Sequence, residues 1–176
     1  MLVDKFVRDE LNKFAKYVIQ QSRSNLTKGG KNVSKELYNS LGYDLKNTNK
    51  GFGLSFQMQD YGKFQDRGVR GNKSSAKAPN SPFRFGTGSG VKGGLTKGID
   101  KWVRRKGIQF RDKRGRFLSY ESTAYLITRS IYQKGIKSSM FFTKPFIAAF
   151  KRLPDELVEA YAIGLEKQIQ VNLNKK

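Results

Sequence analysis

Hydrophobic residues recur at spacings of three and four over the first nineteen positions of the chain. This spacing places them on one stripe of a helix, and polar residues fall largely on the other side. Two consecutive glycines, Gly29 and Gly30, are expected to end the helix, and a short helical turn is predicted at 34–39. The pattern therefore predicts an amphipathic first helix whose apolar stripe consists of Val3, Phe6, Val7, Leu11, Phe14, Val18 and Ile19.

The period of the pattern then changes from helical to two. Apolar residues alternate with polar ones from Leu41 to Leu45 and again from Phe52 to Met58. A turn-rich stretch, 47–51, separates the two runs. Two alternating runs around a turn are typical of a β-hairpin with one buried face.

Regular patterning is lost from Arg67 to Gly94, where glycine, serine and lysine dominate. A structureless stretch of this length is unusual within a compact domain, and is often functional or disordered. We expect an extended, flexible loop. Phe83 and Phe85 interrupt its polar character, so we expect part of the loop to dock against a partner.

Residues 95–135 form a predicted helical insertion. Leu95, Ile99, Trp102 and Val103 fit a helix that Gly107 ends. Residues 108–117 suggest two short strands joined by a basic turn. A second helix is expected from Glu121 to Lys134, with Ser119 or Ser122 as its N-cap and with Leu126, Ile127, Ser130 and Ile131 facing inward.

The last helix is expected to begin at Pro154, which suits a first turn, followed by two acidic residues that favour the helix dipole. Its predicted apolar stripe consists of Val158, Tyr161, Ala162, Leu165 and Ile169. Together these elements predict one α+β domain spanning 1–176. Its core would be a small, twisted antiparallel sheet, with a β-hairpin, packed against the N- and C-terminal helices.

Charge adds a strong constraint on partners. The chain has 35 Lys and Arg residues against 14 Asp and Glu, a net charge of +21. The 50 residues from Arg67 to Arg116 hold 15 basic and two acidic residues, so they carry +13 of that surplus. An uneven surplus favours nucleic acid, an anionic membrane or an acidic protein partner over simple solubility.

Two absent residue types narrow the chemistry. Without cysteine there are no thiolate nucleophiles, disulfides or cysteine-based zinc sites, and without histidine there is no imidazole base or imidazole metal ligand. We therefore expect no catalytic activity, no cofactor and no metal. No apolar run approaches the roughly 20 residues that span a bilayer, and charges interrupt the N-terminus at once. We accordingly expect a soluble protein, made in the cytoplasm, with no membrane partner.

Two motifs have weak functional interpretations. The run Gly86-Thr87-Gly88-Ser89-Gly90 lacks a preceding strand and a Gly-Lys-Ser/Thr ending, so a flexible loop is favoured over a phosphate site. Asp155 and Glu156, with Glu166 and Lys167, resemble the carboxylates and lysine of some nucleases. They are strung along one helix instead of converging on a metal, so helix capping and a solvated face explain them better.

A basic run from 101 to 116 lies beside aromatic residues. Basic side chains among aromatics can bind phosphates and stack bases, although Trp102 also fits the apolar stripe of its helix and is expected in the core. A charged surface contacting an acidic partner and plain solvation stay open as alternatives. The predicted basic surface comprises Lys101, Arg104, Arg105, Lys106, Arg111, Lys113, Arg114 and Arg116.

Two short segments resemble a known family. The segment 61–68, Tyr-Gly-Lys-Phe-Gln-Asp-Arg-Gly, is similar to the tyrosine–aromatic–acid–glycine segment of tail-completion and head–tail joining proteins of tailed bacteriophages. The segment 144–150, Lys-Pro-Phe-Ile-Ala-Ala-Phe, resembles that family's proline–phenylalanine segment before the last helix. Asp66 stands where glutamate is commoner, and the insert between the motifs is longer than usual.

The resemblance implies a structural function in the virion. Copies would form a homo-oligomeric ring in the phage neck or upper tail, joining the head connector to the tail around the DNA channel and touching neighbouring connector and tail proteins. Residues implied in subunit or partner contacts are Tyr61, Phe64, Asp66, Phe83 and Phe85. The alternative is a sequence-independent nucleic-acid-binding protein, and a non-specific contact with DNA is compatible with both.

Overall fold

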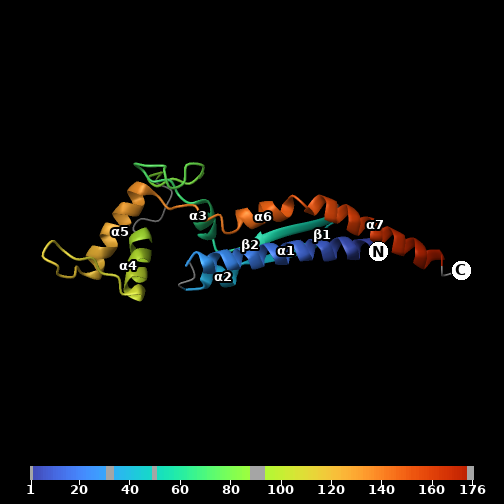
Figure 1. The fold of residues 1–176 in the computed structure, drawn as a ribbon, viewed down its shortest axis with the longest axis horizontal. Coiled ribbons are helices and arrows are strands. Elements are labelled where there is room, and N and C mark those ends of the chain that lie inside the picture. Colours follow the sequence, from blue (N-terminus) through green and yellow to red (C-terminus); the bar gives the residue numbers. More distant parts are fainter. Residues whose placement is uncertain (1, 31–33, 49–50, 88–93, 174–176) are drawn as a thin grey trace. The chain divides into compact units, whose positions relative to one another are not determined.

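The computed structural model of the chain describes residues 2–30, 34–48, 51–87 and 94–173 (Figure 1). The chain divides into two compact units. The first comprises Met1–Gly62 and Met140–Lys176, and the second comprises Lys63–Ser139. Both α-helices and an antiparallel pair of strands are present, so the predicted mixed α and β class is confirmed. That all 176 residues fold as one domain stays a prediction.

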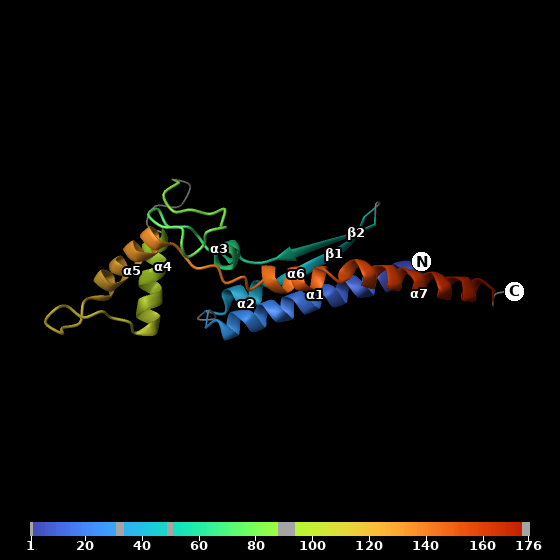
Figure 2. The same ribbon diagram turned by 45° about the horizontal axis from the view of Figure 1, so that its top comes forward.

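The first unit is built on two long helices that lie side by side (Figures 1 and 2). Gly164 of the last helix lies against Val3 near the start of the first, whereas Leu153 shares a cluster with Leu11, so the two helices run antiparallel. The described elements of this unit are α1 (Leu2–Lys28), α2 (Glu36–Ser40), β1 (Gly42–Thr48), β2 (Gly51–Gln57), α6 (Thr143–Phe150) and α7 (Leu153–Leu173).

The predicted hairpin is confirmed. Strands β1 and β2 pair antiparallel, with Leu45 opposite Leu54 and Tyr43 opposite Phe56. Burial alternates along β2, where every second residue is half-buried. One face of this small sheet therefore points toward the helices, as the period of two requires.

The hydrophobic core of the first unit joins the sheet to the helices. Phe14 of α1 is the hub of an aromatic cluster, with ring centroids 6.1 Å from Phe56 and 5.8 Å from Phe146. These edge-on contacts suit the charge distribution of aromatic rings. The predicted packing of the sheet against N- and C-terminal helices is thus confirmed, with a core of Leu11, Phe14, Val18, Ala149 and Leu153.

The predicted stripe of the last helix was wrong. α7 buries Leu153, Ala160 and Gly164, while Val158, Tyr161, Ala162, Leu165 and Ile169 are exposed. Small residues decide this orientation, because they let the two helix backbones approach. A β-carbon at Gly164 would lie 2.7 Å from the Cα of Val3. The proline–phenylalanine segment before α7 also forms a helix of its own, α6.

The second unit contains most of α3 (Gly62–Arg67), together with α4 (Gly94–Lys106) and α5 (Tyr120–Lys134). Both predicted helices of the insertion are present. The hydroxyl oxygen of Ser119 accepts a hydrogen bond of 3.1 Å from the Ser122 backbone N–H, which identifies Ser119 as the cap. The buried residues of α5 are Thr123 and Ala124, whereas Leu126 is exposed, so the prediction that Leu126 faces inward was wrong.

The described part of the long loop is folded, not extended. Residues 68–87 form no helix or strand of their own, but isolated bridges pair Val69 with Ile136 and Arg70 with Arg84. The hydroxyl of Ser81 donates a 2.7 Å hydrogen bond to the carbonyl oxygen of Gly68. These bonds hold residues 68–87 against the second unit. The expectation that this loop is extended was therefore wrong. Its mobility stays a prediction.

Candidate functional site

The exposed face of α4 carries half of the predicted basic surface. Val103 is fully buried, and Lys101 and Arg105 lie on the opposite side of the helix. Arg104 and Lys106 lie on its flanks and are also exposed. Trp102 is 37% exposed, so the prediction that it belongs to the core was wrong. The physical reason is helical geometry: Val103, one residue on, takes the inward position, which turns Trp102 toward the edge of the face.

The other half of the predicted basic surface lies on a turn between α4 and α5, and Asp112 holds this turn together. Its carboxylate accepts hydrogen bonds from the backbone N–H of Arg114 at 2.8 Å, from the backbone N–H of Arg116 at 2.9 Å and from the Arg116 side chain at 2.9 Å. The backbone bond from Arg116 contributes most to lowering the pKa of Asp112. An isolated bridge between Arg111 and Phe117 replaces the two short strands expected here.

Aromatic contact fixes Arg111 on this turn. Its guanidinium carbon lies 4.1 Å from the centre of the Phe117 ring, and one of its N–H groups donates to the Gly115 carbonyl oxygen at 3.0 Å. Phe117 is itself exposed. A cation held over an exposed ring is a suitable contact for a phosphate or a carboxylate.

Most of the predicted basic surface has no acidic partner among the described residues. Arg104 pairs with Asp100 at 2.9 Å and with Glu121 at 3.6 Å, and Arg116 pairs with Asp112 at 2.9 Å. The other six side chains form no ion pair within the described part of the chain: Lys101, Arg105, Lys106, Arg111, Lys113 and Arg114. The surface therefore offers uncompensated positive charge to an anionic partner.

The two phenylalanines of the loop pack within their own unit. Phe83 meets Phe64 edge-on with ring centroids 4.6 Å apart, and Phe85 lies 5.6 Å from the ring of Tyr132. Both are half-buried. The predicted inter-subunit role of these rings stays a prediction, but each ring already has a neighbour in its own subunit.

The remaining residues of the resemblance fall into two groups. Asp66 is buried, and its carbonyl oxygen accepts hydrogen bonds from Ser138 Oγ at 2.7 Å and from the Ser139 backbone N–H at 3.1 Å. Its segment is thus part of the internal structure of the second unit. Tyr61 belongs to the first unit, where burial, and then the negative charge of Glu36, raise the pKa of its hydroxyl.

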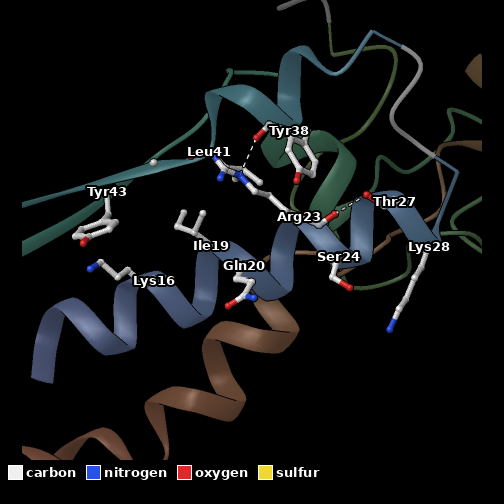
Figure 3. A pocket seen from close by; sticks show the side chains of 11 residues that line it. Lys16, Ile19, Gln20, Arg23, Ser24, Thr27, Lys28, Tyr38, Leu41 and Tyr43 are labelled. Carbon is white, nitrogen blue, oxygen red and sulfur yellow. Dashed lines mark hydrogen bonds between the residues drawn. The ribbon is translucent and has the colours of Figure 1, made fainter.

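An open groove of about 800 Å³ in the first unit was not predicted from the sequence (Figure 3). Arg23 closes one side of it. Its Nε donates to the Tyr38 carbonyl oxygen at 3.2 Å, and its Nη2 donates to the Leu41 carbonyl oxygen at 3.0 Å. The groove contains Lys16 and Lys28 but no carboxylate. Because Arg23 satisfies backbone carbonyls, we interpret its role as a tie between α1 and the start of the hairpin.

The described residues contain no cluster of three or more His, Cys, Asp or Glu side chains able to hold a metal ion. Asp155, Glu156 and Glu166 lie along α7 as the sequence indicates. Gly88, Ser89 and Gly90 of the glycine-rich run lie outside the described residues. Among the helices that the structure describes, none has the length and apolar character to cross a membrane.

Comparison of the chain with protein-family models, with curated proteins and with solved structures gave no match. The proposed function therefore rests on the residues of this chain and on their geometry. They describe a mixed α and β protein of two compact units, with a cationic surface on the second unit and an exposed apolar surface on α6 and α7.

Proposed function

We propose that this protein is a structural subunit of the neck or upper tail of a tailed bacteriophage. In this role, copies form a ring that joins the head connector to the tail around the DNA channel. The observation that carries the proposal is the apolar surface on α6 and α7, which includes exposed Ile147, Phe150, Val158 and Tyr161. Apolar patches of this kind on a soluble protein mark surfaces of association.

The order of elements also supports the proposal. The segment with the tyrosine–aromatic–acid–glycine motif follows the hairpin and precedes the loop, and the proline–phenylalanine segment leads into the last helix. This is the order that the resemblance implies. The long loop and the insertion with α4 and α5 lie between the two segments.

The test of the proposal is the assembly state of the purified protein. Light scattering after size exclusion, over a wide range of protein concentration, should give a mass several times the 20.0 kDa of one chain. Negative-stain images should show closed rings of uniform size. A protein that stays monomeric at every concentration and salt level would contradict the proposal.

Sequence-independent binding of nucleic acid is the second candidate function. It is supported by the six unpaired cations on α4 and on the turn at 111–116, and by Phe117, whose ring supports Arg111. Each phosphate that such cations contact releases bound counterions, so affinity falls steeply with salt.

The salt dependence supplies the corresponding prediction. Replacing Lys101, Arg105, Arg111 and Arg114 with serine should reduce the slope of log K against log salt by about 3 to 4 on duplex DNA, because each lost phosphate contact contributes roughly 0.9. Fluorescence anisotropy with a labelled random duplex measures the slope. The control replaces Lys5, Lys28, Lys144 and Lys151 of the first unit with serine. If both variants bind DNA like the parent, this surface does not contact DNA.

A further inference from the structure

The face of α7 that points away from α1 carries two parallel rows of side chains. With 3.6 residues per turn, four of its exposed apolar residues fall within about a quarter of the helix circumference, whereas exposed Ile163, Val171 and Leu173 lie elsewhere on the helix. Val158 is 70% exposed and Tyr161 is 54% exposed, although both are large apolar side chains. The apolar row consists of Val158, Tyr161, Leu165 and Ile169.

An acidic row lies directly beside the apolar row. Asp155, Glu159 and Glu166 fall on one line along the helix, and all three are exposed. None of them forms an ion pair with another described residue; Glu166 only accepts a 3.3 Å hydrogen bond from Gln170. α7 has four acidic residues and one lysine, a net charge of −3 in a chain of +21. Its outward face therefore suits a partner that is both basic and apolar.

The outward face of α4 has the complementary character. Lys97, Lys101 and Arg105 follow each other at intervals of four residues on the side opposite buried Val103, and exposed Trp102 lies beside them. The rise of 1.5 Å per residue separates neighbouring charges in this row by about 6 Å. Asp155 and Glu159 on α7 have the same separation, so two ion pairs can form in register.

We propose that the outward face of α7 binds the outward face of α4 on a second copy of the chain. This inference rests on the proposed function, because it names the surfaces through which subunits associate. The two faces differ and lie on different units of the chain, which suits a heterologous, head-to-tail contact. Such a contact forms a ring when the rotation from copy to copy closes, as the proposed function requires.

Charge excludes the competing anionic partners from the α7 face. The phosphates of nucleic acid and the headgroups of anionic lipids would both meet the row of Asp155, Glu159 and Glu166 and be repelled. The excess of positive charge in the second unit makes another copy of this chain the matching partner. Ion pairs placed beside an apolar contact set the register of association and disfavour wrong partners.

Charge reversal tests the contact. One variant changes the α7 face, Glu159→Lys with Glu166→Lys, and leaves Asp155 in place because a carboxylate in the first turn stabilises the helix. The other variant changes the α4 face, Lys101→Glu with Arg105→Glu. Each variant alone should self-associate at least about tenfold more weakly than the parent, because like charges then face each other. Sedimentation velocity over a range of concentrations measures this.

The decisive experiment mixes the two charge-reversal variants. In an equimolar mixture, the parental α4 face of one variant meets the parental α7 face of the other, and the two reversed faces also have opposite charges. The mixture should therefore associate about as well as the parent. Matched controls with equal charge changes elsewhere, Asp9→Lys with Asp60→Lys and Lys73→Glu with Lys77→Glu, should associate like the parent. Thermal melts verify that each variant is folded.

The outcomes separate this inference from the proposed function. Suppose that the parent forms rings. If both reversal variants also form rings, or if their mixture stays dissociated, the proposed α7–α4 contact is wrong, while the proposal of a ring is retained. If the parent is monomeric at every concentration, both proposals fail. The neutral pair Glu159→Gln with Glu166→Gln should weaken association less than reversal does, and an equal or larger loss would contradict the pairing of charges.

Discussion

Replacing Phe14 with alanine should lower the free energy of unfolding of the first unit by about 3–5 kcal/mol, the usual cost of removing a buried phenylalanine. Phe14 is 5% exposed and packs against the rings of Phe56, Phe146 and Phe150. The three rings come from the sheet and from α6, so no single neighbour can move into the space left. Chemical denaturation followed by far-ultraviolet circular dichroism measures the loss.

Tyr17 supplies the control for that prediction. It lies on the same helix one turn away but is exposed, so Tyr17→Ala should change stability by only about 0.5 kcal/mol. Hydrogen exchange should show faster exchange across α1, α6 and the hairpin in Phe14→Ala alone. Equal losses in the two variants would mean that the aromatic cluster does not hold the sheet and the helices together.

Replacing Gly135 with alanine should destabilise the second unit by at least about 3 kcal/mol. Gly135 has φ 81° and ψ 178°, a conformation that essentially only glycine adopts and that costs other residues roughly 1–3 kcal/mol. A β-carbon there would also meet the carbonyl oxygen of Val69 and lie 2.6 Å from the backbone nitrogen of Gly71. Backbone atoms cannot move aside without breaking the pairing of Val69 with Ile136.

Gly107 is the matched control, since it also has positive φ but has nothing within 4 Å of its added β-carbon. Gly107→Ala should cost only the roughly 1–2 kcal/mol of left-handed backbone. The single tryptophan, Trp102, lies in the second unit, so denaturation followed by tryptophan fluorescence reports on that unit. If the two glycine variants unfold at the same denaturant concentration, the close approach at Gly135 is not what stabilises the loop.

The two proposals share the α4 row, because DNA binding and the contact with α7 of another copy both use Lys101 and Arg105. Once the α7–α4 contact forms, the cations on the turn at 111–116 are left to meet DNA. Experiments at high salt help to separate them, because DNA binding falls steeply with salt, while burial of the apolar row is retained. An assembly that persists in salt that abolishes DNA binding is therefore expected.

The elements themselves could be predicted from local patterns. The stripe of α1, the alternation at 41–45 and 52–58, the end of α1 at glycine and the Ser119 cap each depend on residues close in sequence. Local propensity and period are enough for such features. The concentration of charge in the second unit was equally visible, since it is only a count of side chains.

Tertiary structure alone decided which face of α7 is buried. Both faces of α7 carry apolar residues, and a periodic pattern favours the larger ones, Val158, Tyr161 and Leu165. The helix instead buries Ala160 and Gly164, because only small side chains let it lie close to α1. Because this face is buried, the row of large apolar residues is left exposed beside unpaired carboxylates. A local sequence pattern cannot distinguish such an exposed row from a buried one. The loop likewise depends on residues far along the chain, because Val69 pairs with Ile136.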